Sequence, residues 1–190
     1  MSADAISPWE ELRAITQRPF LVLDTETTGL TKPEAVAVAV VDHTGTPRIS
    51  RLVRPAKAIE PDASAITGID AAAVAAEPEF PAIEAELTKL LANRDVAIYN
   101  AHYDTEVLRN TYRRYGLPEP AYRPWCVMKW FARVYGDWDP VREGFRWKPL
   151  RVAAEYFGVA QDSPHDALDD CLTTWRVLMA ALKMANAEAR

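Results

Sequence analysis

The chain has 190 residues, of which 49% are hydrophobic, and this length is better suited to one domain with a packed core than to two domains. We therefore expect a single domain over residues 1–190. Lysine and arginine total 22 against 27 aspartates and glutamates, and the resulting net charge of −5 excludes a basic protein that coats nucleic acid.

Cysteine usage and the absence of long apolar runs indicate the compartment. Cys126 and Cys171 are flanked by apolar residues, which is typical of buried free thiols in a reducing compartment rather than of a disulfide framework or a zinc site. The N-terminal residues lack the basic and apolar regions of a signal peptide, and no apolar run approaches the roughly 18 residues of a membrane span. We expect a cytoplasmic protein that has no membrane partner.

Helix caps and β-rich runs predict the elements of the first half. Ser7 and Pro8 are typical of a helix start, and apolar residues follow them at helical spacing. Three β-rich runs come next at short intervals, so we expect an antiparallel three-stranded meander. The expected elements are a helix at 7–17, a strand from residue 20, strands at 34–41 and 49–54, a loop bounded by Pro55 and Pro61, and a helical turn at 64–69.

The second half alternates helices with a further strand. Its clearest helix start is at Ser163 and Pro164, from which we expect a helix to about residue 187. The other expected elements are helices at 80–91, 103–115 and 150–157, a strand at 96–99, an apolar segment at 125–135 that ends as a helix, and a loop at 136–149. This order predicts an α/β fold in which a mixed sheet, the antiparallel meander plus parallel strands, is flanked by helices.

Two carboxylates lie at the end of the first strand. Because side chains alternate along a strand, Asp24 and Glu26 point to the same face, about 6 to 7 Å apart. Like charges at this separation repel each other, and hard dications such as Mg²⁺ or Mn²⁺ take oxygen ligands of this kind. The pattern indicates a metal site, and the alternative is an ordinary strand that ends in a polar turn at Thr28 and Gly29.

A third carboxylate lies near the start of the helix expected at 103–115. Asp104 shares the face of the apolar residues of this helix, and a carboxylate that faces the core needs a partner. The free N–H groups of the helix N-terminus offer one. Asp104 is therefore either a capping residue or a metal ligand that faces the same site as Asp24.

A histidine and three aspartates lie at the start of the last helix. The ordinary pKa of a histidine such as His165 is about 6.5, which suits proton abstraction from water. Asp166, Asp169 and Asp170 all lie off the apolar stripe of the helix, so periodicity does not select among them. They are equally compatible with a solvated acidic face.

These segments resemble the three motifs of the DEDDh, or DnaQ-like, 3′–5′ exonuclease family. The motifs are Asp24-Thr-Glu26 followed by Thr-Thr-Gly-Leu, then Asn100-Ala-His-Tyr-Asp104, and then His165-x-Ala-x-x-Asp170, all within residues 18–182. The resemblance implies a ribonuclease H-like fold and His165 as general base. The ligands that it implies for two divalent cations, Mg²⁺ or Mn²⁺, are Asp24, Glu26, Asp104 and Asp170.

The family pattern also implies a site for the terminal nucleotide of a nucleic acid. The segment after the first strand is expected to hold this nucleotide, with Leu30 wedged against its base, and residues 64–69 are expected to pack nearby. The substrate-binding residues expected on this basis are Thr27, Thr28, Gly29, Leu30, Ile66, Asn100 and Tyr103.

The implied reaction is hydrolysis of phosphodiester bonds from a free 3′ end, with release of nucleoside 5′-monophosphates. The first motif and the likeness of residues 125–133 to exonuclease X favour single-stranded DNA as the partner. The chain departs from many members at Cys126 and Val127, where they have an Asp-Thr pair. The alternatives are an RNA-trimming exoribonuclease, such as oligoribonuclease or RNase T, and a catalytically silent nucleic-acid-binding module.

The loop expected at 136–149 is rich in aromatic and basic residues. Arg142, Phe145, Arg146 and Trp147 could stack on the bases of a single strand. The alternative is that the aromatic residues pack the loop against the protein.

Overall fold

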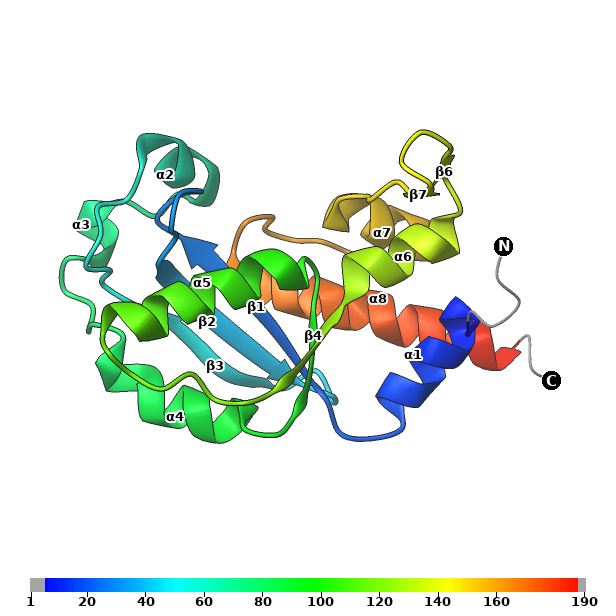
Figure 1. Cartoon of the computed structure of the whole chain (residues 1–190), viewed down its shortest axis with the longest axis horizontal. Coiled ribbons are helices and arrows are strands. Elements are labelled where there is room, and N and C mark those ends of the chain that lie inside the picture. Colours follow the sequence, from blue (N-terminus) through cyan, green and yellow to red (C-terminus); the bar gives the residue numbers. More distant parts are fainter. Residues whose placement is uncertain (1–5, 188–190) are drawn as a thin grey trace.

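A five-stranded mixed sheet forms the centre of the computed structural model, which describes residues 6–187 (Figure 1). The ends of the expected domain, residues 1–5 and 188–190, lie outside this range. The strands are β1 (Leu21–Thr27), β2 (Ala35–Asp42), β3 (Pro47–Leu52), β4 (Asp95–Ile98) and β5 (Arg123–Cys126), in the spatial order β3-β2-β1-β4-β5.

Strand β1 is central and pairs differently on its two sides. It is antiparallel to β2, which is antiparallel to β3, so the first three strands form the predicted meander. On its other side β1 is parallel to β4, and β4 is parallel to β5. The predicted mixed sheet is confirmed. The pairing of β1 with β2 is irregular between Glu26 and Thr27, where the chain leaves the sheet.

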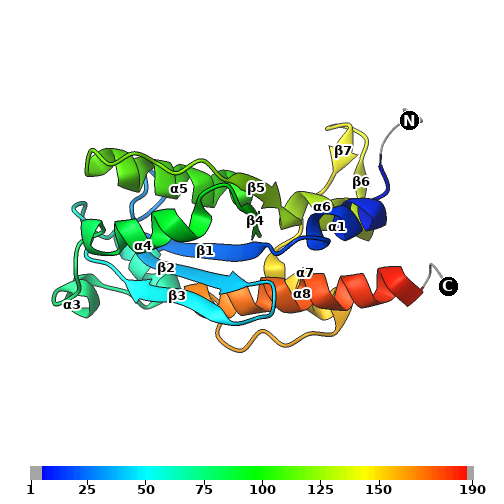
Figure 2. The ribbon, with the colours of Figure 1, turned by 90° about the horizontal axis from the view of Figure 1, so that it is seen from below.

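Helices cover both faces of the sheet (Figure 2). Helices α4 (Pro81–Leu91) and α5 (Ala101–Arg114) pack on one face. The other face is covered by α1 (Pro8–Thr16), α6 (Val127–Tyr135), α7 (Leu150–Phe157) and α8 (Ala167–Ala187). The short helices α2 (Pro61–Thr67) and α3 (Ala71–Val74) connect β3 to α4. No helix within residues 6–187 combines the length and apolar character needed to cross a membrane.

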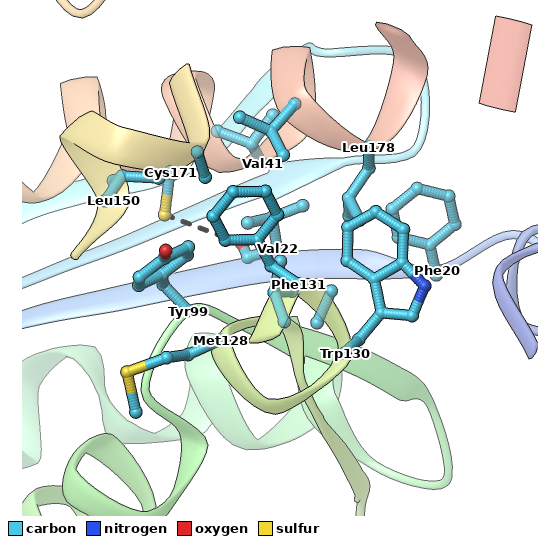
Figure 3. Close-up of a cluster of buried hydrophobic side chains, with 14 of the residues drawn as sticks. Phe20, Val22, Val41, Tyr99, Met128, Trp130, Phe131, Leu150, Cys171 and Leu178 are labelled. Atoms are coloured by element: carbon cyan, nitrogen blue, oxygen red, sulfur yellow. Dashed lines mark hydrogen bonds between the residues drawn. The ribbon is translucent and has the colours of Figure 1, made fainter. Parts of the chain in front are cut away.

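Alternation along β1 assigns each side chain to one face of the sheet. Leu21 and Leu23 are buried with α4 and α5, whereas Val22 is buried in the cluster beneath α8 that Figure 3 shows. Asp24 and Glu26 lie two and four residues beyond Val22 and so continue its face. The two carboxylates therefore emerge on the side of the sheet that α8 covers.

Both cysteines are free thiols, as the sequence predicts, but they differ in burial. Cys171 of α8 is fully buried in the cluster of Figure 3, and its Sγ lies 3.3 Å from the Ala39 carbonyl oxygen. Cys126, at the end of β5, is half-buried. Cys171 thus belongs to the packing between α8 and the sheet.

Two boundaries differ from the sequence prediction because of proline. Strand β5 begins in a segment that was not predicted as a strand, and Pro124 within it has no N–H to donate. The structure tolerates this proline because β5 is an edge strand that pairs with β4 alone. Helix α2 begins at Pro61 rather than at residue 64, because proline suits the first helical turn.

The expected loop at 136–149 contains a hairpin. Its strands are β6 (Trp138–Asp139) and β7 (Gly144–Phe145), which pair in antiparallel fashion. Two residues per strand are too few for an alternating pattern to be visible in the sequence. In Figure 1 the hairpin lies beside α6 and α7, at the other end of the molecule from α2.

Candidate active site

Three carboxylates converge where β1 ends and α8 begins. One ligand oxygen from each of Asp24, Glu26 and Asp170 lies within 4.8 Å of those of the other two residues. Glu26 is buried, and Asp24 and Asp170 are half-buried. Oxygen atoms this close can contribute to the coordination of a shared cation.

Helix α8 begins later than the sequence predicts. The expected start is Ser163, but His165 adopts a left-handed conformation with φ of 66°, and the helix begins at Ala167. Asp166 takes the capping role, because its Oδ1 accepts a hydrogen bond from the Asp169 N–H at 2.9 Å.

The three aspartates of this segment have different surroundings. Asp166 caps the helix. Asp169 is buried, and its Oδ2 accepts hydrogen bonds from the N–H groups of Asp162 at 3.1 Å and Ser163 at 2.9 Å, which hold the preceding loop. Asp170 joins the carboxylate cluster. The tertiary structure therefore separates residues that helical periodicity could not.

Two donors orient the Asp170 carboxylate. The Gln161 side-chain amide donates to its Oδ1 at 2.8 Å, and the backbone N–H of His165 donates to its Oδ2 at 3.3 Å. Sequence reasoning did not single out Gln161, because this residue precedes the helix in a segment without a motif. The His165 side chain is exposed.

Asp104 is buried in the first turn of α5 and bonds to β1. Its Oδ1 accepts hydrogen bonds from the Thr25 N–H at 3.1 Å and from the Thr25 hydroxyl at 2.8 Å. These bonds tie α5 to β1. Asp104 lies outside the group of three carboxylates within 4.8 Å, but it is close enough for its charge to raise the pKa of Asp24.

The four carboxyl groups form a strongly acidic site. Burial, followed by the charges of Asp104 and Asp170, raises the pKa of Asp24 well above its ordinary value. Burial and the same two charges raise the pKa of Glu26 to about 8. Burial also raises the pKa of Asp104 to about 7, although the bonds from Thr25 lower it, and raises the pKa of Asp170.

The donor set fits divalent cations. Within residues 6–187, no lysine or arginine forms an ion pair with any of the four carboxylates. Buried carboxylates of like charge ionise readily only beside a positive charge. A site made of carboxylate oxygens suits hard cations such as Mg²⁺ and Mn²⁺.

A pocket of about 390 Å³ opens beside the carboxylates. It lies between the end of β1, α2 and the start of α5, and Leu30 and Ile66 present apolar surface with exposed fractions of 82% and 59%. The lining residues are Thr25, Glu26, Thr27, Gly29, Leu30, Glu60, Asp62, Ala63, Ile66, Thr67, Asn100, Tyr103 and His165. We call this the nucleotide pocket after the ligand that the family resemblance predicts there, and its volume lies within the range of small-ligand sites.

Tyr103 and Gly29 shape one wall of the nucleotide pocket. The Tyr103 hydroxyl donates to the Gly29 carbonyl at 3.0 Å and lies 2.8 Å from the Thr27 hydroxyl oxygen. Gly29 has φ of 146°, and a Cβ added there would lie 2.1 Å from a Glu60 carboxylate oxygen. The backbone conformation therefore requires glycine, and a Cβ there would also displace the Glu60 carboxylate.

The expected substrate-binding residues line the pocket, with the exception of Thr28. Thr28 is fully buried, and its hydroxyl oxygen accepts a hydrogen bond from the Glu34 N–H at 3.0 Å. Its carbonyl accepts a bond from the Glu60 N–H at 2.8 Å, so Thr28 supports the loop from behind. The lining residues that the sequence did not predict come mainly from the start of α2, for which Pro61 was an available signal.

The β6–β7 hairpin encloses a second pocket, of about 670 Å³, lined in part by Arg142 and Trp147. Phe145 packs edge-on against Trp138, with ring centroids 5.2 Å apart, so these two rings stabilise the hairpin itself. Trp147 is 62% exposed, and the Lys129 ammonium lies 6.0 Å from its ring centroid. The hairpin thus packs some of its aromatic rings and leaves Trp147 exposed.

Comparison with known proteins identifies the family. The family model of the RNase T exonucleases matches residues 21–178, a range that contains the four carboxylates and His165. The chain belongs to this exonuclease family. The uncharacterized exonuclease CP81 of Escherichia phage 186 is 34% identical to it over 172 residues, which cover 86% of this chain and 88% of the phage protein.

Solved structures agree with the family assignment. Exonuclease X in complex with 5′ overhanging duplex DNA has 27% identity and a TM-score of 0.67, over 88% of this exonuclease and 93% of that chain. The nuclease domain of 3′hExo, a DEDDh family member bound to rAMP, has 20% identity and a TM-score of 0.65, over 89% and 92% of the two chains. The ribonuclease H-like fold and the resemblance to DEDDh-type 3′–5′ exonucleases are confirmed, and the protein is a nuclease of the hydrolase class.

Proposed function

We propose that this exonuclease removes nucleotides from the 3′ end of nucleic acid and releases nucleoside 5′-monophosphates. The observation that carries the proposal is the position of the carboxylate cluster beside the nucleotide pocket of about 390 Å³. This arrangement can place the last phosphodiester bond of a strand against the carboxylates while the terminal nucleotide fills the pocket. We further propose that residues 1–190 act as one exonuclease domain, which the family match over residues 21–178 supports.

The carboxylates act together in the proposal. Those assigned to hold two divalent cations, Mg²⁺ or Mn²⁺, are Asp24, Glu26, Asp104 and Asp170. Such ions, when bound, activate a water for attack and stabilise charge on the leaving 3′ oxygen. The pKa of Glu26 is raised to about 8 by burial and by repulsion from neighbouring carboxylates. This supports the assignment, because a cation beside Glu26 would offset the cost of ionising it.

We assign His165 as the general base. Its backbone is bonded to Asp170, its side chain is exposed, and it lines the nucleotide pocket, so the imidazole can reach a water beside the carboxylates. The imidazole takes a proton from the attacking water as the new bond to phosphorus forms. The bond between phosphorus and the 3′ oxygen of the preceding nucleotide then breaks, and the terminal nucleotide leaves with its 5′ phosphate.

The terminal nucleotide occupies the nucleotide pocket in this proposal. Leu30 and Ile66 present apolar surface to its base. Asn100 and Tyr103 supply polar atoms for its sugar. Thr28 contributes indirectly, through the hydrogen bonds that hold the loop.

Single-stranded DNA is the proposed substrate. The likeness to exonuclease X, solved with duplex DNA, supports DNA, since its 27% identity extends over 88% of this chain. The rival substrate is RNA, and 3′hExo was solved with rAMP, although at 20% identity that likeness carries the fold alone. The two substrates are distinguished by the initial rates at which the enzyme hydrolyses DNA and RNA strands of the same sequence in the presence of Mg²⁺ or Mn²⁺.

The activity test follows the shortening of a 5′-labelled single strand. The wild type should produce a ladder that shortens from the 3′ end when Mg²⁺ or Mn²⁺ is added, together with nucleoside 5′-monophosphates. Asp24→Asn should abolish the ladder, while Glu106→Gln, an exposed carboxylate on α5, should leave it unchanged. Full turnover by a folded Asp24→Asn variant would contradict the assignment. If the wild type is inactive on both DNA and RNA, the alternative of a catalytically silent nucleic-acid-binding module remains.

A further inference from the structure

Another pocket, of about 560 Å³, adjoins the nucleotide pocket along the loop that follows β1. Gly29 and Leu30 line the nucleotide pocket, and the next two residues line the second one. Its opposite wall is the last part of α5, which runs alongside the loop in Figure 1. We call it the α5 pocket, and its lining residues are Thr31, Lys32, Glu34, Lys57, Asn110, Arg113 and Arg114.

The α5 pocket is basic, although the chain has a net charge of −5. Its lining contains four lysine and arginine side chains and one carboxylate, that of Glu34. This carboxylate is buried and already bonded, since its Oε2 accepts from the N–H groups of Ala56 at 2.9 Å and Lys57 at 3.1 Å, and its Oε1 lies 3.6 Å from the Arg114 Nε. One carboxylate with these partners leaves the pocket with excess positive charge.

Two of the four cations form no ion pair with the residues that the structure describes. The Lys57 ammonium donates to the Thr31 carbonyl at 2.6 Å and to the Glu60 carboxylate at 2.8 Å, so its charge is engaged. Lys32 and Arg113 are exposed and form no ion pair with any residue in the range 6–187. These two side chains are available to an anionic ligand.

Asn110, one of the residues that line the α5 pocket, has a side-chain amide donor without a partner. The Asn110 Nδ2 is buried and has no hydrogen-bond acceptor among the residues that the structure describes. Buried donors are normally paired, so such a group needs an explanation. A turn of the Asn110 amide toward an anion bound in the pocket would give this donor an acceptor, and this observation is independent of the charge count.

We propose that the α5 pocket binds a backbone phosphate of the nucleic acid while the terminal nucleotide occupies the nucleotide pocket. The choice of ligand rests on the proposed function. A phosphodiester matches the groups present, because a guanidinium binds its oxygens in pairs and an ammonium binds them as a point charge. Leu30 lines the nucleotide pocket and directly precedes Thr31 of the α5 pocket, so the two pockets adjoin along the chain. The phosphate therefore belongs either to the cleaved strand or to a complementary strand that separates from it near Leu30.

The test removes the two unpaired charges with the double substitution Lys32→Gln and Arg113→Gln. Binding to a single-stranded DNA and to a duplex with a 5′ overhang is measured by fluorescence anisotropy in EDTA, which prevents hydrolysis, over a series of KCl concentrations. Each neutralised phosphate adds about 0.7 to the salt slope of single-strand binding, so loss of this one contact should lower the slope by about 0.7 and the affinity near 0.1 M salt by about 5-fold.

The matched control is Arg18→Gln with Lys183→Gln. It removes the same two kinds of charge from exposed positions outside both pockets, and it should keep the wild-type slope. If the Lys32→Gln and Arg113→Gln variant loses affinity for both substrates, the phosphate belongs to the cleaved strand. If it loses affinity for the duplex alone, the phosphate belongs to the complementary strand. The proposal would be overturned if the double variant kept the wild-type affinity and salt slope with both substrates. It would also be overturned if the wild type bound neither substrate at the lowest salt concentration.

A minimal substrate separates this proposal from the proposed function. The p-nitrophenyl ester of thymidine 5′-monophosphate carries one nucleotide, so it fills the nucleotide pocket without reaching the α5 pocket. The double variant should hydrolyse it with the wild-type kcat/KM while its KM for an oligonucleotide rises. Should the wild type cleave neither substrate, the proposed function fails, and the anisotropy result still decides whether the α5 pocket binds phosphate.

Discussion

The acidic cluster should make the metal-free protein less stable as the pH rises, and Glu26 allows this effect to be measured. Burial and the charges of Asp170 and Asp104 raise the pKa of Glu26 from 4.5 to about 8. Between these two pH values the folded protein retains a proton that the unfolded chain has lost, so the free energy of unfolding decreases as the pH increases. At about 1.4 kcal/mol per pKa unit, Glu26 alone accounts for at most about 3 to 4 kcal/mol between pH 5 and pH 8.

Glu26→Gln replaces this carboxyl group with a neutral one of the same shape and removes its titration. In EDTA, the Tm of the variant relative to wild type should therefore rise with pH, by up to roughly 6 to 16 °C between pH 5 and pH 8, since about 1 kcal/mol changes Tm by about 2 to 4 °C at this chain length. Circular dichroism melts at each pH give the comparison. With saturating Mg²⁺ or Mn²⁺ the wild type should have the higher Tm, because it binds the cation more tightly than the variant.

The control for this experiment is Glu106→Gln, which removes an exposed carboxylate of α5. Its Tm should follow that of the wild type at every pH in EDTA and should rise equally when Mg²⁺ is added. If the difference in Tm between Glu26→Gln and wild type instead stays constant from pH 5 to pH 8, Glu26 does not lie in a buried acidic cluster and the electrostatic reasoning is refuted.

Three further substitutions test other parts of the site. His165→Ala should slow hydrolysis by roughly 10²-fold while leaving the Mg²⁺-induced rise in Tm intact, and an unchanged rate would exclude His165 as the base. Gly29→Ala should cost about 1 to 3 kcal/mol in urea unfolding, because its Cβ would lie 2.1 Å from a Glu60 oxygen at a φ of 146°, and the added substitution Glu60→Ala should restore part of the loss. Trp147→Ala should weaken single-strand binding by about 1 to 3 kcal/mol if the ring stacks on a base, and an unchanged Kd in a folded protein would exclude stacking.

The parts of the site that the sequence predicts are those determined by local geometry. Asp24 and Glu26 share a face because side chains alternate along one strand, and no distant contact is needed for that inference. The predicted meander has the same basis, since short connections between β-rich runs favour antiparallel pairing. Asp104 was placed on a core-facing stripe by helical periodicity, but its partner could not be predicted, because Thr25 lies 79 residues away in the sequence.

The remaining features depend on tertiary contacts or on short irregular elements. The left-handed backbone conformation is usually adopted by glycine or asparagine, but here it is adopted by His165. The late start of α8 therefore has no signal in the sequence. The different surroundings of Asp169 and Asp170 follow from that turn, since one carboxylate bonds the loop before the helix and the other faces the end of β1. Family motifs selected Asp170 where periodicity did not.

The distribution of charge around the loop after β1 explains how an acidic protein can act on a polyanion. A lysine or arginine inside the carboxylate cluster would neutralise the acids and occupy the place of a cation. Two cations that form no ion pair within residues 6–187, Lys32 and Arg113, lie instead in the α5 pocket, next to Leu30 along the chain. Salt screens exposed charges more than buried ones. If the two proposals hold, increasing salt should raise the KM for oligonucleotides through the α5 pocket and leave kcat, which the proposed mechanism assigns to the carboxylate cluster, much less affected.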